Sequence, residues 1–425
     1  MSLKCELKKL IPQNLLNQYH LLILRKKNEK TIKSTRQHYK EVEQKIKNRN
    51  GQPLRFASYV VYDSTFAAYG LMDLMLNNPT NYSPTIVICP DVARGKENLK
   101  NQYKKTKDFF VKKYGKDFVL DGYDETTNTF FDYSSEFDIV YCANPYDSMV
   151  NEVHSIKYLS TQNVLPVYIN YGCLVDQYSY KYVMPLLEMS LFWKVFADEN
   201  YSLKDFHKYE LCKGNNVEIT GYAKMDALAD CVIKKSKRKR VIIAPHHTIN
   251  AKVLPLSNFL ELSDFILELP RKYPNIDFIF RPHPLLFTNM VNEVGWKQSQ
   301  VEDYIKSVEE SGMIYSCGGD YLEIFANSDA IIHDCASFIM EYLYTSNPCC
   351  FVAKKQNKDI FSKLGQNCLK YYYLAYNKNE ILNFIDAVVQ SETDPLKIKR
   401  EKFLKEKIAI NYPNVSKKIL EIISL

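Results

Sequence analysis

Short apolar segments alternate with helix-forming segments along most of the chain, and this alternation limits the folds that the chain can adopt. The segments expected as strands are 56–62, 85–89, 137–142, 164–170, 191–198, 240–244, 276–280, 330–333 and 349–352. Strands that are apolar throughout are buried on both faces, which is typical of parallel sheets covered by helices. The pattern therefore predicts an α/β protein built from parallel strands with helical connections.

The strands form two series that are separated near Gly221, which predicts two α/β halves of similar size with a ligand between them. The expected divisions are a helical leader at 1–50, a first domain at 51–220, a second domain at 221–390, and helices at 391–425 that pack back toward the first domain. Helices of the second half are expected at 259–269, 301–311, 337–344, 379–389 and 397–425. Ligands of such sheets bind beyond the carboxyl ends of the strands.

Positive charge is concentrated in the leader. Residues 1–50 contain 13 basic and 4 acidic residues, whereas the formal net charge of all 425 residues is +7. The remaining 375 residues therefore carry a net charge of −2, which argues against a nucleic-acid-binding protein. Two interpretations of the leader stay open, namely a helix packed on the first domain or an interfacial helix that rests on anionic lipid.

The sequence lacks the motifs that mark common cofactor and metal sites. It has no G-x-G-x-x-G, no G-x-x-x-x-G-K-[ST], no H-E-x-x-H, no C-x-x-C and no D-x-D. We therefore expect no cofactor and no bound metal, and any phosphate must be held by helix N-termini and basic side chains. Eleven dispersed cysteines, with no secretory signal and no apolar run of roughly 20 residues, indicate a cytoplasmic protein without a transmembrane helix.

Histidines follow the ends of three strands of the second series. His246 and His247 come after 240–244, His283 follows 276–280 within Arg-Pro-His-Pro, and His333 ends 330–333. The carboxyl ends of parallel strands lie side by side at one edge of a sheet, so these side chains are expected to converge. A histidine at such a place either donates a hydrogen bond to an anionic ligand or acts as an acid or base near neutral pH.

Basic and polar residues accompany these histidines. Arg281 precedes the histidine of the Arg-Pro-His-Pro turn, and its guanidinium suits a phosphate. Asp334 follows 330–333, and Ser337 stands where a helix is expected to begin, so that this segment forms either an anion cradle or an ordinary helix cap. Glu341 lies one turn later on the same helix face, where it is expected to accept hydrogen bonds from a ribose, and Lys224 supplies positive charge before the second series.

Three motifs together resemble the CDP-glycerol glycerophosphotransferase family of teichoic-acid-type polymerases and primases. They are Gly-Tyr-Ala-Lys-Met-Asp at 221–226, Arg-Pro-His-Pro at 281–284, and Asp-Cys-Ala-Ser at 334–337 with Glu341 behind it. The resemblance covers roughly residues 165–355 and implies a GT-B fold. Such a fold has two Rossmann-like domains, of which the first holds the acceptor and the second the nucleotide donor. The resemblance also implies a membrane-associated enzyme of cell-envelope or capsule polymer synthesis.

The first domain departs from the family pattern. The family has a His-Gly pair at the end of a first-domain strand, and its histidine is the proposed base. The matching residues here are Asn170, Tyr171 and Gly172, which we assign to the acceptor side. A tyrosine with an ordinary pKa near ~10 is a poor base at neutral pH, so the base is expected elsewhere.

The resemblance implies a transferase that moves glycerol phosphate, or a similar polyol phosphate, from a CDP-activated donor to a hydroxyl of a glycan or lipid-linked acceptor and releases CMP. Arg281 and His283 would neutralise charge on the departing CMP. The candidates for the base are His246, His247 and Asp63, which follows 56–62. The basic leader would then hold the protein on the inner face of the cytoplasmic membrane.

Three other functions stay open. The first is a glycosyltransferase of the same architecture that uses a nucleotide sugar for surface polysaccharide synthesis. The second is a nucleotide-sugar 2-epimerase, which would need acidic residues in the cleft and no membrane acceptor. The third is a nucleic-acid binder that uses 1–50 and the basic run 234–240, although the charge of the remaining chain argues against it.

Overall fold

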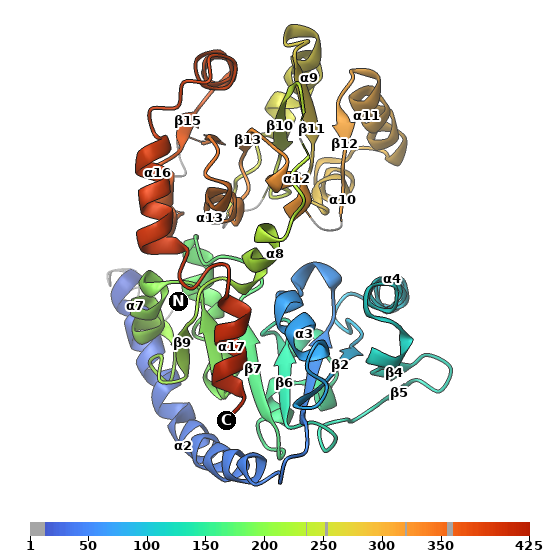
Figure 1. Ribbon diagram of the computed structural model, residues 1–425, viewed down its shortest axis with the longest axis vertical. Helices are drawn as coiled ribbons and strands as arrows, with labels where there is room; N and C mark the ends of the chain where they lie inside the picture. The colour runs from blue at the N-terminus through green and yellow to red at the C-terminus, as the bar shows by residue number, and fades with distance from the viewer. Residues whose placement is uncertain (1–12, 235, 251–253, 319–320, 355–359) are drawn as a thin grey trace, which may run out of the picture.

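The computed structural model describes residues 13–234, 236–250, 254–318, 321–354 and 360–425. It contains a seven-stranded sheet and a six-stranded sheet, in which all strand pairs are parallel, and a small antiparallel hairpin, β4 (Tyr123–Asp124) with β5 (Thr129–Phe130). Figure 1 shows the two sheets stacked along the long axis, the first below the second. The predicted α/β class with parallel sheets flanked by helices is confirmed.

The first sheet has the strand order β3-β2-β1-β6-β7-β8-β9. Its strands are β1 (Leu54–Val60), β2 (Tyr82–Ile88), β3 (Val119–Asp121), β6 (Ile139–Cys142), β7 (Leu165–Ile169), β8 (Lys194–Ala197) and β9 (Val217–Ile219). The helices that accompany it are α2 (Gln13–Lys47), α3 (Tyr69–Leu76), α4 (Lys96–Tyr114), α5 (Ile156–Leu159), α6 (Leu187–Leu191) and α7 (Asn200–Tyr209). Buried apolar side chains cover both faces of the sheet, which explains why its central strands are apolar throughout.

The second sheet has the strand order β12-β11-β10-β13-β14-β15. Its strands are β10 (Lys239–Ala244), β11 (Ile276–Phe280), β12 (Ile314–Tyr315), β13 (Ala330–His333), β14 (Cys349–Val352) and β15 (Tyr373–Ala375). Its helices are α8 (Asp226–Ala229), α9 (Phe259–Lys272), α10 (Leu286–Asn289), α11 (Gln298–Glu310), α12 (Leu322–Ala326), α13 (Phe338–Glu341), α14 (Lys363–Leu369), α15 (Lys378–Phe384) and α16 (Lys397–Phe403). Two buried apolar clusters fill the opposite faces of this sheet as well.

The C-terminal segment passes from the second sheet to the first. The segment 397–425, which was expected to be helical, contains α16, a π-helical turn at 404–408, and a separate helix α17 (Val415–Ile423). The helical segment ends at Ile408, and the following turn, in which Asn411 has a left-handed φ of 54° and Pro413 has no N–H to donate, separates it from α17. Beyond this break, α17 packs against α3 of the first sheet, as Figure 1 shows at its red end.

The leader helix α2 is attached to the first sheet along its C-terminal part. Tyr39, Val42 and Ile46 are buried in the core of that sheet. Arg36 donates to the backbone oxygens of three residues at the end of α6, and Arg25 donates to those at the end of α7. These arginines satisfy carbonyl groups that the two helices leave unpaired. The interpretation of the leader as a packed helix therefore holds for this part of α2.

The N-terminal part of α2 exposes apolar side chains. Leu15, Tyr19, Leu22 and Ile23 are 46–61% exposed, and we call these four residues the apolar tip. The exposed Lys26, which is one turn after Leu22, continues the same helix face. In the part of the chain that the structure describes, no helix has the length and apolar character needed to cross a membrane.

Candidate functional site at the facing sheet edges

The carboxyl ends of the two sheets meet across a short set of contacts. Val175 accepts a hydrogen bond from the backbone of Ser362, and Gln177 donates one to Ile360, so the segment after β7 touches the segment after β14. The Tyr222 hydroxyl, in the connection between the sheets, lies 2.9 Å from the backbone oxygen of Tyr171. The carboxyl edges of the two sheets therefore adjoin at this connection, and parallel α/β sheets bind their ligands at such edges.

Three of the predicted histidines form one cluster. His246 and His247 follow β10, and His283 follows the neighbouring strand β11. The ring centroids are 4.4 Å apart for His246 and His247, 4.1 Å for His247 and His283, and 5.2 Å for His246 and His283. We call these residues the three-histidine group, and the structure places them together as the strand ends predicted.

The three rings are held by hydrogen bonds to their Nδ1 atoms. Nδ1 of His246 lies 3.3 Å from the backbone nitrogen of Thr248, and Nδ1 of His283 lies 3.1 Å from that of Leu285. Nδ1 of His247 lies 3.1 Å from Nδ2 of Asn289, on α10. Each ring is therefore oriented by a group on its own domain.

Burial lowers the pKa of every member of the group. The pKa falls to about 4 for His247 and to about 3 for His283, and that of His246 falls well below its usual value. The second cause for His246 and His283 is the charge that a neighbouring ring would carry. The group is therefore neutral at pH 7, and one ring nitrogen of each residue lies within 4.8 Å of one from each of the others.

Asp334 and His333 lie behind this group and have structural partners. The Asp334 carboxylate accepts hydrogen bonds from the backbone nitrogens of His246 and Asn258 and from the Asn258 side chain. It thus fixes the loop after β10, and burial raises its pKa to about 6. His333 is buried among three aromatic rings, its Nδ1 accepts a hydrogen bond from the backbone nitrogen of Cys335, and its Nε2 is buried without a partner.

Ser337 precedes α13, which is a single turn followed by the 3₁₀ turn Tyr342–Thr345. The Ser337 hydroxyl makes no capping hydrogen bond, so the ordinary reason for a serine at this position does not apply. Glu341 is buried, and its carboxylate accepts hydrogen bonds from the Tyr222 and Tyr321 hydroxyls. The carboxylate that we expected to meet a ribose is therefore already bonded to two tyrosines.

Two predicted cations gather around Tyr321. The Lys224 ammonium lies 4.7 Å from the centre of the Tyr321 ring, and the Arg281 guanidinium carbon lies 5.7 Å from it. Arg281 is buried and donates to Ser316 and to the backbone oxygen of Gly318 at 2.9 Å each. Two positive charges are thus held at the edge of the second sheet beside the three-histidine group.

The first sheet contributes tyrosines at its facing edge. Tyr171 is hydrogen-bonded to Tyr146, and burial raises the pKa of Tyr171 above its usual value, which makes a phenolate at neutral pH still less favourable. Asp63 lies in a half-exposed 3₁₀ turn, Asp63–Thr65, after β1. The predicted acceptor-side residues thus lie at the same edge, but they do not form a cluster comparable with the histidines.

Two aspartates at this edge, Asp198 and Asp91, were not predicted. Asn170 is buried, and its amide nitrogen lies 3.4 Å from an oxygen of Asp198, at the end of β8. Asp91, at the end of β2, accepts hydrogen bonds from Tyr62 and Arg94. Asp198 directly follows the apolar end of β8, as Asp334 follows that of β13, whereas Cys89 and Pro90 separate Asp91 from β2.

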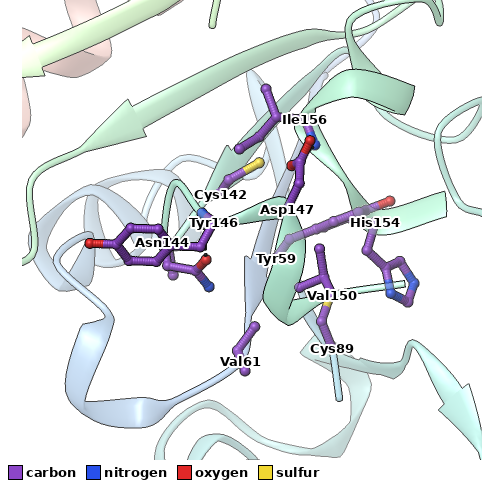
Figure 2. A pocket seen from close by; sticks show the side chains of 11 residues that line it. Tyr59, Val61, Cys89, Cys142, Asn144, Tyr146, Asp147, Val150, His154 and Ile156 are labelled. Carbon is purple, nitrogen blue, oxygen red and sulfur yellow. Dashed lines mark hydrogen bonds between the residues drawn. The ribbon is translucent and has the colours of Figure 1, made fainter. Parts of the chain in front are cut away.

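A small pocket lies at the ends of β1, β2 and β6. Figure 2 shows its lining, which includes Asn144, Tyr146 and Asp147 beside the buried Tyr59 and His154. Tyr146 connects this pocket to Tyr171 through their hydrogen bond. A second small pocket, with a mostly apolar lining, lies between β10, β13 and α9 and reaches Asp334.

Solved structures of two kinds share this architecture. The wall teichoic acid polymerase TagF matches with a TM-score of 0.55 and 14% identity, over 96% of this chain and 97% of that chain. UDP-GlcNAc 2-epimerase from Neisseria meningitidis, bound to UDP-GlcNAc, matches with a TM-score of 0.53 and 15% identity, over 87% of this chain and 99% of that chain. The S. aureus MnaA–UDP structure gives a TM-score of 0.53 and 12% identity, over 87% and 96%.

These likenesses define the class of the protein by its fold. The chain has a GT-B fold, with two parallel α/β sheets whose carboxyl edges face each other, as the motifs implied. No protein-family model matches the sequence, and a search of curated proteins finds no significant match. Because one fold hosts many functions, the function of this protein depends on the residues of its site.

Proposed function

We propose that this protein is a transferase that moves glycerol phosphate, or a similar polyol phosphate, from a CDP-activated donor to a hydroxyl of an envelope glycan or lipid-linked acceptor. The observation that carries the proposal is the character of the second-sheet edge. Among the residues that the structure describes, that edge presents three histidine rings and two cations, and the carboxylates of Asp334 and Glu341 are already hydrogen-bonded to protein groups. Hydrogen-bond donors and cations at one sheet edge suit a diphosphate.

In this proposal, Arg281 and His283 stabilise the charge that develops as CMP leaves, and Ser337 and Lys224 help to hold the diphosphate. The acceptor approaches from the first sheet, where Tyr171 and the pocket beside it lie. The choice of a CDP-polyol is supported by the three sequence motifs and by the wider coverage of the TagF structures, 96% of this chain against 87% for the epimerases.

We also infer that the protein is cytoplasmic and meets the inner face of the membrane through α2. The apolar tip would enter the headgroup region while the lysines that follow it approach anionic lipid. A lipid-linked acceptor would then be presented next to the first sheet, on which α2 packs.

The test is release of CMP from CDP-glycerol in the presence of a lipid-linked acceptor. We expect turnover by the intact chain and a loss of about 100-fold or more in kcat for Arg281→Gln, because a preorganised charge is removed. Arg238→Gln is the matched control, because Arg238 pairs with Asp277 at the opposite end of the second sheet. Failure to release CMP from any member of a panel of CDP-polyols would overturn the proposal.

A nucleotide-sugar 2-epimerase is the second candidate, and Asp198 favours it. This carboxyl group is buried at the edge of the first sheet and one of its oxygens has no hydrogen-bond partner, as an acid that works in the cleft would require. A nucleotide screen separates the proposed transferase from this epimerase and from a glycosyltransferase that uses a nucleotide sugar. CDP and CMP should raise the Tm under the transferase proposal, whereas UDP should raise it for a UDP-sugar enzyme.

A further inference from the structure

We propose that the three-histidine group is a neutral hydrogen-bond donor site for phosphate oxygens, and that its rings act neither as the general base nor as ligands of a metal ion. This inference deepens the proposed function. It rests on that function in one respect, namely that the bound phosphate belongs to a nucleotide donor. The donor character itself follows from the groups that hold the rings.

Two of the rings receive backbone N–H groups. The backbone nitrogen of Thr248 donates to Nδ1 of His246 at 3.3 Å, and the Thr248 hydroxyl, which can donate as well, lies 2.8 Å from the same atom. The backbone nitrogen of Leu285 donates to Nδ1 of His283 at 3.1 Å. A backbone N–H can only donate, so both Nδ1 atoms must be unprotonated acceptors. The single proton of each neutral ring then resides on Nε2.

The third ring is fixed by a side chain whose orientation is also determined. Nδ2 of Asn289 lies 3.0 Å from the backbone oxygen of His247 and 3.1 Å from Nδ1 of the same residue. Because a carbonyl oxygen can only accept, the Asn289 atom between them must be the amide nitrogen. Nδ1 of His247 is therefore an acceptor as well, and all three rings have the same tautomer.

This tautomer removes the chemistry that a base or a metal ligand needs. A neutral ring that carries its hydrogen on Nε2 can take up a second proton only at Nδ1. In each of the three rings the lone pair of Nδ1 already accepts a hydrogen bond from an N–H group. In a metal-bound histidine, the second ring nitrogen carries a hydrogen and donates a hydrogen bond to a carboxylate, a carbonyl or water. Here the corresponding nitrogen, Nδ1, accepts a hydrogen bond instead. Of the base candidates that we considered, Asp63 is the one outside this group.

The same tautomer suits a phosphate oxygen. Each ring offers an Nε2–H donor without adding a positive charge, so the three rings can lie 4.1–5.2 Å apart without mutual repulsion. The lowered pKa values agree with this neutral state. Arg281, two residues before His283, supplies the charge that the rings lack.

The first test measures the tautomers directly. The full chain labelled with ¹⁵N-histidine should show, at pH 7, an unprotonated Nδ1 and a protonated Nε2 for each of the three rings. His246→Gln, His247→Gln and His283→Gln assign the signals. Protonated Nδ1 atoms in any two of these rings would overturn the proposal, whatever reaction the protein catalyses.

The second test compares binding of an oxyanion and of a metal, with sulfate and Ni²⁺ titrated separately at constant ionic strength. We expect saturable sulfate binding and no saturable Ni²⁺ binding by the unmodified protein. His247→Phe should weaken sulfate binding about tenfold, because a donor to an anion is lost, whereas His247→Gln, which keeps an N–H, should stay within about threefold. Tight Ni²⁺ binding, or sulfate binding that is unchanged in His247→Phe, would contradict the proposal.

Asn289→Asp is the matched control, because it exchanges the donor at Nδ1 of His247 for an acceptor of the same shape. We expect the proton of His247 to move to Nδ1, with weaker sulfate binding at pH 8. Thermal denaturation checks that each variant is folded. Neither test uses a nucleotide or an acceptor, so sulfate binding without CMP release would reject the proposed transferase but leave this inference intact.

Discussion

At the scale of single residues, the partners of three buried carboxyl groups decide what each can do. Asp334 is surrounded by N–H donors and positions the loop after β10, and Glu341 is bonded to two tyrosines. Asp198 has only the amide of Asn170, at 3.4 Å, and its second oxygen is buried without a partner, as is the amide oxygen of Asn170. A proton on Asp198 would let it act as a donor, which a carboxylate cannot.

Asp198→Asn should therefore stabilise the protein at high pH. Burial raises the pKa of Asp198 well above its usual value. The folded state therefore holds a proton that the unfolded state releases above pH ~4, and the free energy of unfolding falls by about 1.4 kcal/mol per pH unit as the pH rises toward the folded pKa. Asparagine does not titrate and can donate in place of the protonated carboxyl group.

Urea denaturation at pH 5 and pH 8 measures this effect. The stability advantage of Asp198→Asn over the unmodified protein should be larger at pH 8 than at pH 5. Asp117→Asn, at an exposed position, is the control and should change the free energy of unfolding by less than about 0.5 kcal/mol at either pH. An advantage that does not depend on pH would show that Asp198 is ionised in the folded protein.

At the scale of elements, α2 joins two surfaces of different character in one helix. Its C-terminal part supplies Tyr39, Val42 and Ile46 to the core, and Arg36 bonds to the end of α6. Its N-terminal part carries the apolar tip. Deleting residues 1–50 would thus remove core side chains together with the surface that we propose for the membrane, so a membrane test has to change the tip alone.

The triple variant Leu15→Gln, Tyr19→Gln, Leu22→Gln should bind vesicles that contain phosphatidylglycerol more weakly. The reason is that apolar area which would enter the interface is lost, whereas the core is untouched. We expect cosedimentation with vesicles to fall about tenfold or more while the Tm stays unchanged. The control replaces three other exposed apolar residues, Val232, Ile233 and Ile398, by glutamine. Equal losses in both triple variants would contradict a specific role of the tip.

At the scale of the whole molecule, the connection between the sheets is also where the C-terminal segment returns. Gly221 has a φ of +99°, and a Cβ atom there would lie 2.0 Å from the backbone oxygen of Ile410. Asp226 accepts hydrogen bonds from the first backbone nitrogens of α17, those of Val415 and Ser416. The motif 221–226 thus fixes the two sheets to one C-terminal segment, in addition to carrying Lys224.

Gly221→Ala should lower the free energy of unfolding by about 3 kcal/mol or more, because it combines a left-handed φ with a backbone clash. Gly295→Ala is the matched control. Gly295 has a φ of +88° with nothing within 4 Å of a Cβ atom, so it measures the cost of the backbone conformation, about 1 kcal/mol. Denaturant unfolding of both variants gives the difference. Equal losses would mean that the segment around Ile410 moves away without cost.

The sequence by itself determined the α/β class and several strands to the residue, because a strand buried on both faces is a continuous apolar run. Ile276–Phe280, Ala330–His333 and Cys349–Val352 have the predicted bounds. The convergence of His246, His247 and His283 was likewise predicted, since parallel strand ends share an edge. The lysine-rich α4 and the three-residue strand β9 were missed, because neither has an apolar pattern that stands out from its surroundings.

Only the tertiary structure decided what the site residues do. Which ring nitrogen carries the proton depends on donors such as the Asn289 amide, which lies 42 residues from His247 in sequence. The engagement of Glu341 by Tyr222 and Tyr321, and the burial of Asp198 beside Asn170, depend on contacts between strands and between sheets. Local sequence sets backbone pattern and residue type, whereas protonation and hydrogen bonding follow from neighbours that the folded chain brings together.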